Sequence, residues 1–353
     1  MSTSTMKAAV RTGIMGYTLT FSTNHSAPSK PLNEKDSVLV KVHSGSINPI
    51  DYKMPRSFLG PVVGLDFCGT VIEVDPAKNC NGGDDKFEVG DVVFGICKQG
   101  ALAEYTVAKS NEIAKAPKGW KATDCAALPT AYTSALQCLR KGRILPDHYD
   151  NGNDKNDNDN TDAIIIDKSV LIIGASGGCG LAGLQLCVSL GVSRIVAICS
   201  DKNRALVREH GATEVVNYAN ASELESFFAD NQGKFDCVYD AATQSGGGED
   251  YWKKSIGLLR RDEKTIVGEY TALSGSPTKW IRAMCGKQKE HETIIMKESN
   301  SSDLETVARL MDRIGAKPLT KVVAFDEEGL KEAFDLLKSR RTRGKIVFDV
   351  SAM

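Results

Sequence analysis

The sequence lacks the patterns that mark metal-binding, membrane-spanning or nucleic-acid-binding proteins. Its ten cysteines include no Cys-x-x-Cys pair, and its five histidines show no paired spacing. Lys plus Arg (44) nearly balances Asp plus Glu (45), so there is no excess positive charge to attract nucleic acid or an anionic membrane. No apolar run reaches the roughly 18–20 residues that cross a bilayer. Because the cysteines are scattered, we expect them to be buried free thiols in a protein of a reducing compartment.

The N-terminal residues show no targeting pattern either. Residues 1–7 have neither an apolar signal core nor an Arg-rich amphipathic presequence, which predicts a cytoplasmic location. At 353 residues the chain is longer than the chains that usually fold around a single hydrophobic core, so two domains are expected.

The most informative stretch is residues 170–190. Four apolar residues, 170–173, predict a buried parallel strand, and a glycine-rich turn and an apolar helix follow. Glycines let the backbone approach phosphate oxygens, and free N–H groups at a helix start bind them. A plain strand–helix turn is the alternative. The flanking pattern favours a nucleotide pyrophosphate site formed by Gly174, Ala175, Ser176, Gly177, Gly178, Cys179 and Gly180.

The rest of the chain indicates two kinds of architecture. Before residue 122, short strands separated by Gly and Asp turns predict a mostly β domain. Strands are expected at 6–11, 17–21 and 37–47, a turn followed by a strand at 61–74, and short strands with turns at 87–95 and 100–107. Helices are expected at 122–129 and 130–140. From residue 170, strands and helices alternate, which predicts a doubly wound parallel sheet with strands at 170–173, 194–199, 214–217, 235–240, 265–268 and 293–297. We expect the tail, with helices 303–314 and 327–338 and strands 319–324 and 345–350, to return to the first domain.

One segment departs from globular composition. Residues 150–162 are nearly all Asp and Asn, which cannot bury enough apolar surface to become ordered. A Ca²⁺ loop is the alternative, but in an EF-hand frame from Asp154 the glycine position holds Asp159 and the bidentate Glu position holds Ile165. A disordered surface insertion is therefore favoured.

Seven motifs together resemble the zinc-free branch of the medium-chain dehydrogenase/reductase superfamily, near its NADPH:quinone oxidoreductases and alkenal or enone reductases. They are residues 6–10, 46–53, 64–66, 90–95, 126–129, 174–180 and 344–347. The resemblance implies a GroES-like barrel at 1–127 and 299–353 and a Rossmann domain at 128–298. It also implies a homodimer, for which we expect residues 293–297 to be the joining edge strand. The Asp/Asn segment and an enlarged turn at 79–85 depart from the family pattern.

The same resemblance predicts the absence of zinc. Zinc-dependent relatives carry Cys where Asn48 stands and His where Leu65 stands. Leucine cannot ligate a metal and asparagine is a poor zinc ligand, so neither a catalytic nor a structural zinc is expected.

Cofactor preference is set at the tip of the second Rossmann strand. NAD sites place a carboxylate there, whereas the 2′-phosphate of NADP needs donors and positive charge. This chain has Ser200 at the tip and Lys202 and Arg204 in the next turn, which favours NADPH over a simple solvated helix face. The resemblance also places Tyr218 against the adenosine phosphate, with local packing as the alternative.

Candidate catalytic residues follow the first strong strand. The resemblance implies that Asn48 orients the nicotinamide and that Ser134, and less surely Thr130, lie near the cofactor. An Asx turn and helix capping are the respective alternatives. Tyr52 or Lys53 could donate a hydrogen bond to a substrate oxygen as enolate charge develops, although both could be surface residues.

Together with these residues, the resemblance implies an oxidoreductase that transfers hydride from NADPH to a quinone. Reduction of the C=C bond of an α,β-unsaturated aldehyde or ketone is the alternative, because both substrates are conjugated electrophiles. A non-catalytic NADPH-binding protein of the same fold is the alternative from another class.

Overall fold

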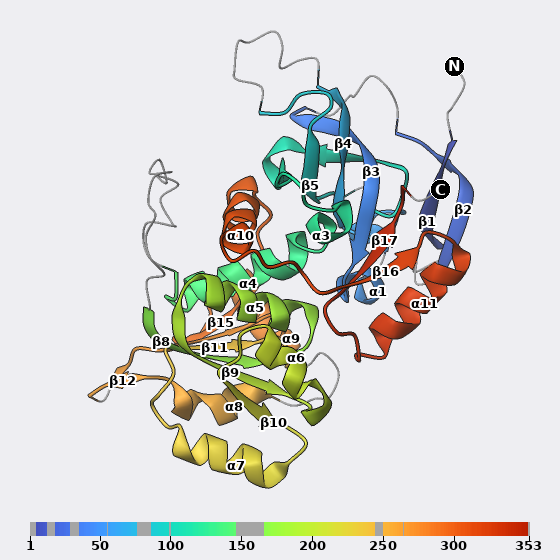
Figure 1. Cartoon of the computed structure of the whole chain (residues 1–353). Coiled ribbons are helices and arrows are strands. Elements are labelled where there is room, and N and C mark those ends of the chain that lie inside the picture. Colours follow the sequence, from blue (N-terminus) through green and yellow to red (C-terminus); the bar gives the residue numbers. More distant parts are fainter. Residues whose placement is uncertain are drawn as a thin grey trace. The chain divides into compact units, whose positions relative to one another are not determined.

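The computed structural model describes residues 5–12, 18–28, 35–54, 56–75, 86–98, 100–145, 166–243, 250–263 and 265–351. The chain divides into two compact units (Figure 1). The first unit is Met1–Thr130, Ser299–Ala308 and Lys317–Met353, and the second is Ala131–Glu298 and Arg309–Ala316. The Asp/Asn segment at 150–162 and the turn at 79–85 lie outside the described residues.

A seven-stranded sheet organises the first unit. Its order is β16-β17-β3-β4-β5-β7, and β6 also pairs with β3. The strands are β3 (Ser37–Ile47), β4 (Asp66–Val74), β5 (Val92–Ile96), β6 (Tyr105–Lys109), β7 (Ile113–Lys115), β16 (Thr320–Ala324) and β17 (Lys345–Asp349). A separate antiparallel pair is formed by β1 (Thr5–Thr12) and β2 (Thr18–Ser26). The short helices are α1 (Ile50–Lys53), α2 (Arg56–Leu59) and α3 (Ala122–Ala126), and α11 (Glu327–Lys338) lies beside β2 (Figure 1).

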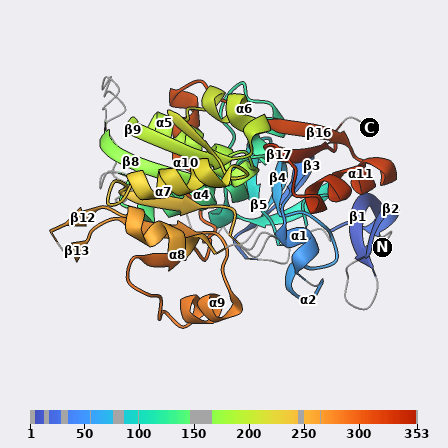
Figure 2. The same cartoon turned by 90° about the horizontal axis from the view of Figure 1, so that it is seen from below.

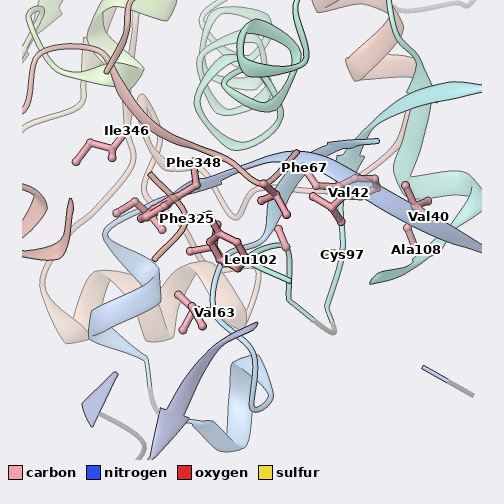
Figure 3. Packing of buried hydrophobic residues seen from close by; sticks show 14 of the residues in the cluster. Val40, Val42, Val63, Phe67, Cys97, Leu102, Ala108, Phe325, Ile346 and Phe348 are labelled. Atoms are coloured by element: carbon pink, nitrogen blue, oxygen red, sulfur yellow. The ribbon is translucent and has the colours of Figure 1, made fainter. Parts of the chain in front are cut away.

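Strand β3 is central because both of its edges are paired and most of its side chains are buried. Its Val40 and Val42 belong to an apolar cluster that also contains Phe67 of β4 and Phe348 of β17 (Figure 3). Antiparallel pairing of β17 with β3 brings the C-terminal segment into the first unit. Residues 309–316 of the expected tail fall in the second unit instead.

A six-stranded parallel sheet organises the second unit, in the order β10-β9-β8-β11-β14-β15. Its strands are β8 (Ile166–Ile173), β9 (Val192–Cys199), β10 (Glu214–Asn217), β11 (Cys237–Asp240), β14 (Glu269–Ala272) and β15 (Glu292–Ile294). The helices are α5 (Gly178–Ser189), α6 (Arg204–Glu209), α7 (Ala221–Asp230), α8 (Tyr251–Ser255) and α9 (Pro277–Met284). Helices α4 (Pro129–Lys141) and α10 (Ser301–Arg313) cross the limits of the two units.

The sheet of the second unit carries helices on both faces. In Figure 2, α5 lies on one face, and α7 and α8 lie on the other. Leu224 and Phe227 of α7 share an apolar cluster with Leu171 of β8 and Val196 of β9. The fold thus has the predicted α/β architecture: one unit with a doubly wound parallel sheet and one mostly β unit.

One predicted strand is wrong. The strand expected at 265–268 contributes only Thr265 and Ile266, as β13 (Thr265–Ile266), to a two-residue antiparallel pairing with β12 (Arg261–Asp262). The fifth strand of the parallel sheet is instead β14, which follows directly. The strand expected at 293–297 is β15 at Glu292–Ile294. No helix in the described part of the chain is long and apolar enough to cross a membrane.

Candidate functional site

A buried ion pair shapes the turn that carries three of the candidate residues. Arg11 Nη2 lies 2.9 Å from Asp51 Oδ1, and neither side chain is exposed to solvent. The guanidinium of Arg11 also donates to the carbonyl oxygen of Val62 at 2.5 Å. The Asp51 carboxylate accepts from the backbone N–H of Asn48 (2.8 Å) and of Gly64 (3.0 Å). The pair therefore holds α1 against the loop that precedes β4.

Burial acts on both charges of this pair. Desolvation raises the pKa of Asp51 to about 6, although the bond from the Asn48 N–H and the charge of Arg11 lower it. Desolvation likewise lowers the pKa of Arg11 from its usual value, against the attraction of Asp51. Asp51 thus remains mostly ionised at neutral pH and anchors the turn through its bonds to Arg11, Asn48 and Gly64.

Tyr52 and Lys53 extend from this anchored turn. Tyr52 is partly buried and packs against the apolar cluster of the first unit. Lys53 is exposed, and desolvation together with the positive charge of Arg340 lowers the pKa of its ammonium group. Its ammonium group can donate a hydrogen bond.

Asn48 lies in a buried polar cluster with Asp66 and Lys345. Its side-chain Nδ2 donates to Asp66 Oδ2 at 2.9 Å, and its Oδ1 accepts from Lys345 Nζ at 2.6 Å. Asp66 Oδ2 also lies 3.2 Å from Lys345 Nζ. Thr130 Oγ1 donates to the other carboxylate oxygen of Asp66 at 2.5 Å. The structure thus brings Asn48 and Thr130 together around one carboxylate.

This donor set does not fit zinc. Leu65 offers no ligand atom, and the ammonium group of Lys345 already bonds Asp66 and Asn48. Across the part of the chain that the structure describes, no group of three or more His, Cys, Asp or Glu could hold a metal ion.

The glycine turn combines a left-handed glycine with a helix start that no side chain caps. Gly174 has a φ of 77°, which an L side chain rarely adopts, and its N–H donates to the carbonyl oxygen of Ile198. Helix α5 starts at Gly178, and no side chain caps its start. A Cβ on Gly180 would lie 2.3 Å from the Gly174 carbonyl oxygen, so only glycine allows this helix to approach the turn. The turn can therefore present backbone N–H groups to an anion.

The neighbouring strand tip joins this turn through one asparagine. Asn203 Nδ2 donates to Ser176 Oγ at 2.8 Å and to Ser200 Oγ at 3.2 Å. Arg204, in contrast, is held by Asp201 and Glu223, each at 3.1 Å. These bonds raise the pKa of Arg204 further, and its guanidinium also donates to the carbonyl oxygen of Val215 in β10. Lys202 is exposed at the same strand tip.

The last two candidate cofactor residues differ in exposure. Tyr218 directly follows β10, donates its N–H to the carbonyl oxygen of Cys199, and is 52% exposed. An exposed aromatic ring beside the tip of β9 is available for stacking against a ligand. Ser134 lies in α4 and is buried.

Sequence reasoning did not single out Arg11, Asn203 or Lys345 as site residues. Asn203 had a readable signal, an amide within the strand-tip segment, whereas Arg11 ends a predicted strand, where a charged residue usually indicates exposure. Lys345 forms its bonds with residues 279 to 298 positions away along the chain, which no local pattern reveals.

Comparison with known proteins agrees with both units. A family model for the alcohol dehydrogenase GroES-like domain matches residues 34–118, and one for zinc-binding dehydrogenase matches residues 210–348. Trans-enoyl reductase pgmF of Aspergillus terreus is 27% identical over 89% of this chain and 86% of its own length. A chloroplastic quinone-oxidoreductase homolog of Spinacia oleracea is 31% identical, over 62% of this chain and 63% of its own. A quinone oxidoreductase structure from Coxiella burnetii superposes with a TM-score of 0.72 at 24% identity, covering 98% of this chain and all of that one.

The fold and these matches define an oxidoreductase with an alcohol-dehydrogenase-type GroES-like domain and a parallel α/β unit. Both matched domains are those of the medium-chain dehydrogenase/reductase superfamily, to which the chain belongs. This confirms the superfamily that the sequence motifs indicated.

Proposed function

We propose that this chain transfers hydride from NADPH to a quinone. The observation that carries the cofactor assignment is the edge formed by the ends of β8, β9 and β10. These three strands are parallel and adjacent in the sheet. The start of α5, which no side chain caps, follows β8; Ser200, which carries no carboxylate, follows β9; and the exposed ring of Tyr218 follows β10. In this proposal, the glycine turn holds the pyrophosphate and Tyr218 covers the adenosine.

The preference for NADPH rests on the strand tip. Ser200 and Lys202 are proposed to contact the 2′-phosphate, with Arg204 adding positive charge while it stays bound to Asp201 and Glu223. Asn203 fixes the Ser200 hydroxyl for this contact.

The first unit is proposed to supply the groups that act at the reacting end. When bound, the nicotinamide supplies the hydride. Asn48 donates a hydrogen bond that orients the nicotinamide end, and Tyr52 or Lys53 donates to the substrate oxygen as negative charge develops there. In this proposal the second proton comes from Tyr52, Lys53 or solvent.

A second candidate substrate is an α,β-unsaturated aldehyde or ketone, reduced at its β-carbon. The match to a protein named a trans-enoyl reductase, over most of both chains, favours it. Hydride would then form the new C–H bond at the β-carbon, and the enolate would take its proton from Tyr52, Lys53 or solvent.

The experiment is the oxidation of NADPH followed at 340 nm with 9,10-phenanthrenequinone, an alkenal and an alkenone in parallel, and with NADH as the cofactor control. Quinone turnover with NADPH supports the proposal, and turnover of the enones alone moves the assignment to C=C reduction. Preference for NADH contradicts the phosphate site, and binding of NADPH without any turnover supports the non-catalytic alternative. The domain limits at 127/128 and 298/299, the cytoplasmic location and the homodimer stay predictions.

A further inference from the structure

A buried lysine ammonium group is the feature of the first unit that the proposed function does not use. Lys345, the first residue of β17, is only 5% exposed. Its Nζ donates three hydrogen bonds, to Asn48 Oδ1 (2.6 Å), Ile47 O (3.2 Å) and Asp66 Oδ2 (3.2 Å). All three N–H groups of the ammonium group therefore have a hydrogen-bond acceptor within the protein.

This arrangement determines which way the Asn48 amide points. An ammonium group can only donate and a carboxylate can only accept. If the amide were turned by 180°, its NH₂ group would face the ammonium group of Lys345 and its oxygen would face the carboxylate of Asp66. Donor would then face donor and acceptor would face acceptor, so neither hydrogen bond could form. The amide oxygen therefore faces Lys345, and Nδ2 faces Asp66.

In this orientation the second N–H of the Asn48 amide can donate to a ligand. Asp66 uses one N–H of Nδ2, and the other has no protein acceptor within the part of the chain that the structure describes. Bonding of the amide oxygen to a cation also polarises the amide and strengthens its remaining N–H as a donor.

We infer that Lys345 is a positioning residue for the reaction: it fixes Asn48 as a hydrogen-bond donor toward the nicotinamide or the substrate oxygen. Asp66 is the matching anion, held in turn by Thr130 and by Ser46 Oγ at 3.3 Å. The inference rests on the proposed function for the identity of the ligand, whereas the orientation of the amide stands on the contacts alone.

The alternative is that Lys345 and Asp66 only stabilise the fold, and the experiment must distinguish this from positioning of Asn48. Removing Lys345 alone leaves the Asp66 carboxylate buried without its cation, which destabilises a fold whatever the function. Lys345→Met is therefore combined with Asp66→Asn, so that the double variant holds no unpaired buried charge.

The first measurement needs neither cofactor nor substrate. Protein labelled with ¹⁵N-asparagine is compared with the Asn48→Ala variant to assign the Asn48 side-chain resonance. In the wild type we expect slow hydrogen exchange at this NH₂ group. In the double variant we expect exchange at least about tenfold faster, or two sets of signals from two amide orientations. An Asn48 resonance and exchange rate unchanged from the wild type would overturn the inference.

The second measurement separates positioning from stability by kinetics. In the double variant we expect kcat to fall about 10- to 100-fold, because a misplaced donor acts on the transition state, while the substrate KM changes much less. Lys345→Arg keeps the charge and the donors and should recover part of kcat. A folded double variant with kcat within about twofold of the wild type would show that the charges serve stability alone.

The matched control is Lys321→Met. Lys321 lies on the adjacent strand β16 and pairs with Glu332 at 2.6 Å on the surface, so its loss should leave kcat and the Asn48 resonance unchanged. If the wild type reduces neither quinone nor enone, the proposed function fails, and the resonance experiment still decides the orientation of Asn48.

Discussion

At the scale of single residues, two buried cations organise the polar interior of the first unit. Arg11 pairs with Asp51, and Lys345 pairs with Asp66. Charged residues within a sequence pattern usually indicate exposure, so neither burial follows from the residue type. The partners lie 40 and 279 positions apart along the chain, and only the folded sheet brings them together.

The Arg11–Asp51 pair leads to a prediction about pH. The pKa of Asp51 in the folded state, about 6, is above its usual value, so the native carboxyl binds a proton before the unfolded one does. The contribution of Asp51 to the free energy of unfolding should therefore increase as the pH falls through 6. Asp51→Asn cannot titrate and should cost about 3 kcal/mol near pH 7, because it leaves Arg11 buried without its anion.

Urea unfolding of the wild type and Asp51→Asn at pH 7, 6 and 5 tests this sign. We expect the difference in free energy of unfolding to grow by about 1 kcal/mol from pH 7 to pH 5. A difference that shrinks as the pH falls would mean that the ion pair lowers the pKa of Asp51 instead.

The strand tip leads to a second prediction at this scale. Lys202→Gln should weaken NADPH binding by about tenfold, because it removes a cation proposed to contact the 2′-phosphate. Arg204→Gln should weaken it less, since Asp201 and Glu223 already bind that guanidinium. Titration of both variants with NADPH and NADH, followed by nucleotide fluorescence, measures this. Equal losses for the two nucleotides in Lys202→Gln would rule out a 2′-phosphate contact.

At the scale of elements, the clearest signals in the sequence were strands and helices with strong apolar periodicity. Strands β3 and β10 and helix α11 have the predicted limits. Strand β14 was missed because its sequence, Glu269–Ala272, has no apolar run, whereas Thr265 and Ile266 just before it look strand-like but pair only locally. Burial of β14 comes from its two neighbours β11 and β15, which a local pattern cannot show.

The start of α5 gives a prediction at this scale that separates folding from binding. A Cβ at Gly180 would lie 2.3 Å from the Gly174 carbonyl oxygen and 2.6 Å from Ala175 Cα, whereas one at Gly177 meets only that carbonyl oxygen at 3.6 Å. Gly180→Ala should therefore destabilise the protein by about 2 kcal/mol and abolish NADPH binding. Gly177→Ala should change stability by less than about 1 kcal/mol but weaken NADPH binding through its added methyl group.

Thermal unfolding and NADPH titration of both variants test this pair. A Gly180→Ala protein as stable as the wild type would contradict the close packing of α5 on the turn. Unchanged NADPH affinity in Gly177→Ala would contradict close approach of the pyrophosphate at this residue.

At the scale of the whole molecule, in the homodimer implied by the family we expect strand β15 to pair with the same strand of a second copy. Strand β15 lies at the edge of the parallel sheet, and the residues on either side of it, His291 and Ile295, bond to β14. Its outward N–H groups, on Glu292 and Ile294, are already bound by Lys289 O (3.2 Å) and Gln288 Oε1 (2.6 Å). Bonds of this kind protect an exposed edge, so pairing there requires displacement of Gln288.

Sedimentation velocity tests this prediction. We expect a species of twice the 38.1 kDa chain mass, and we expect Gln288→Ala to raise the dimer fraction, because it releases the N–H of Ile294. A single monomeric species at micromolar concentration would contradict the dimer. A dimer that Gln288→Ala leaves unchanged would place the interface elsewhere.

The central proposal is hydride transfer from NADPH to a conjugated electrophile, and isotope transfer tests it most directly. The two forms of NADPH that carry deuterium on one or the other face of nicotinamide C4 are each incubated with an enone, and the product is analysed by mass spectrometry. We expect one form to deliver one deuterium to the β-carbon of each product molecule, and the same form to slow quinone reduction through a primary isotope effect. Binding of NADPH with neither deuterium transfer nor an isotope effect would contradict catalysis and leave a nucleotide-binding protein of this fold.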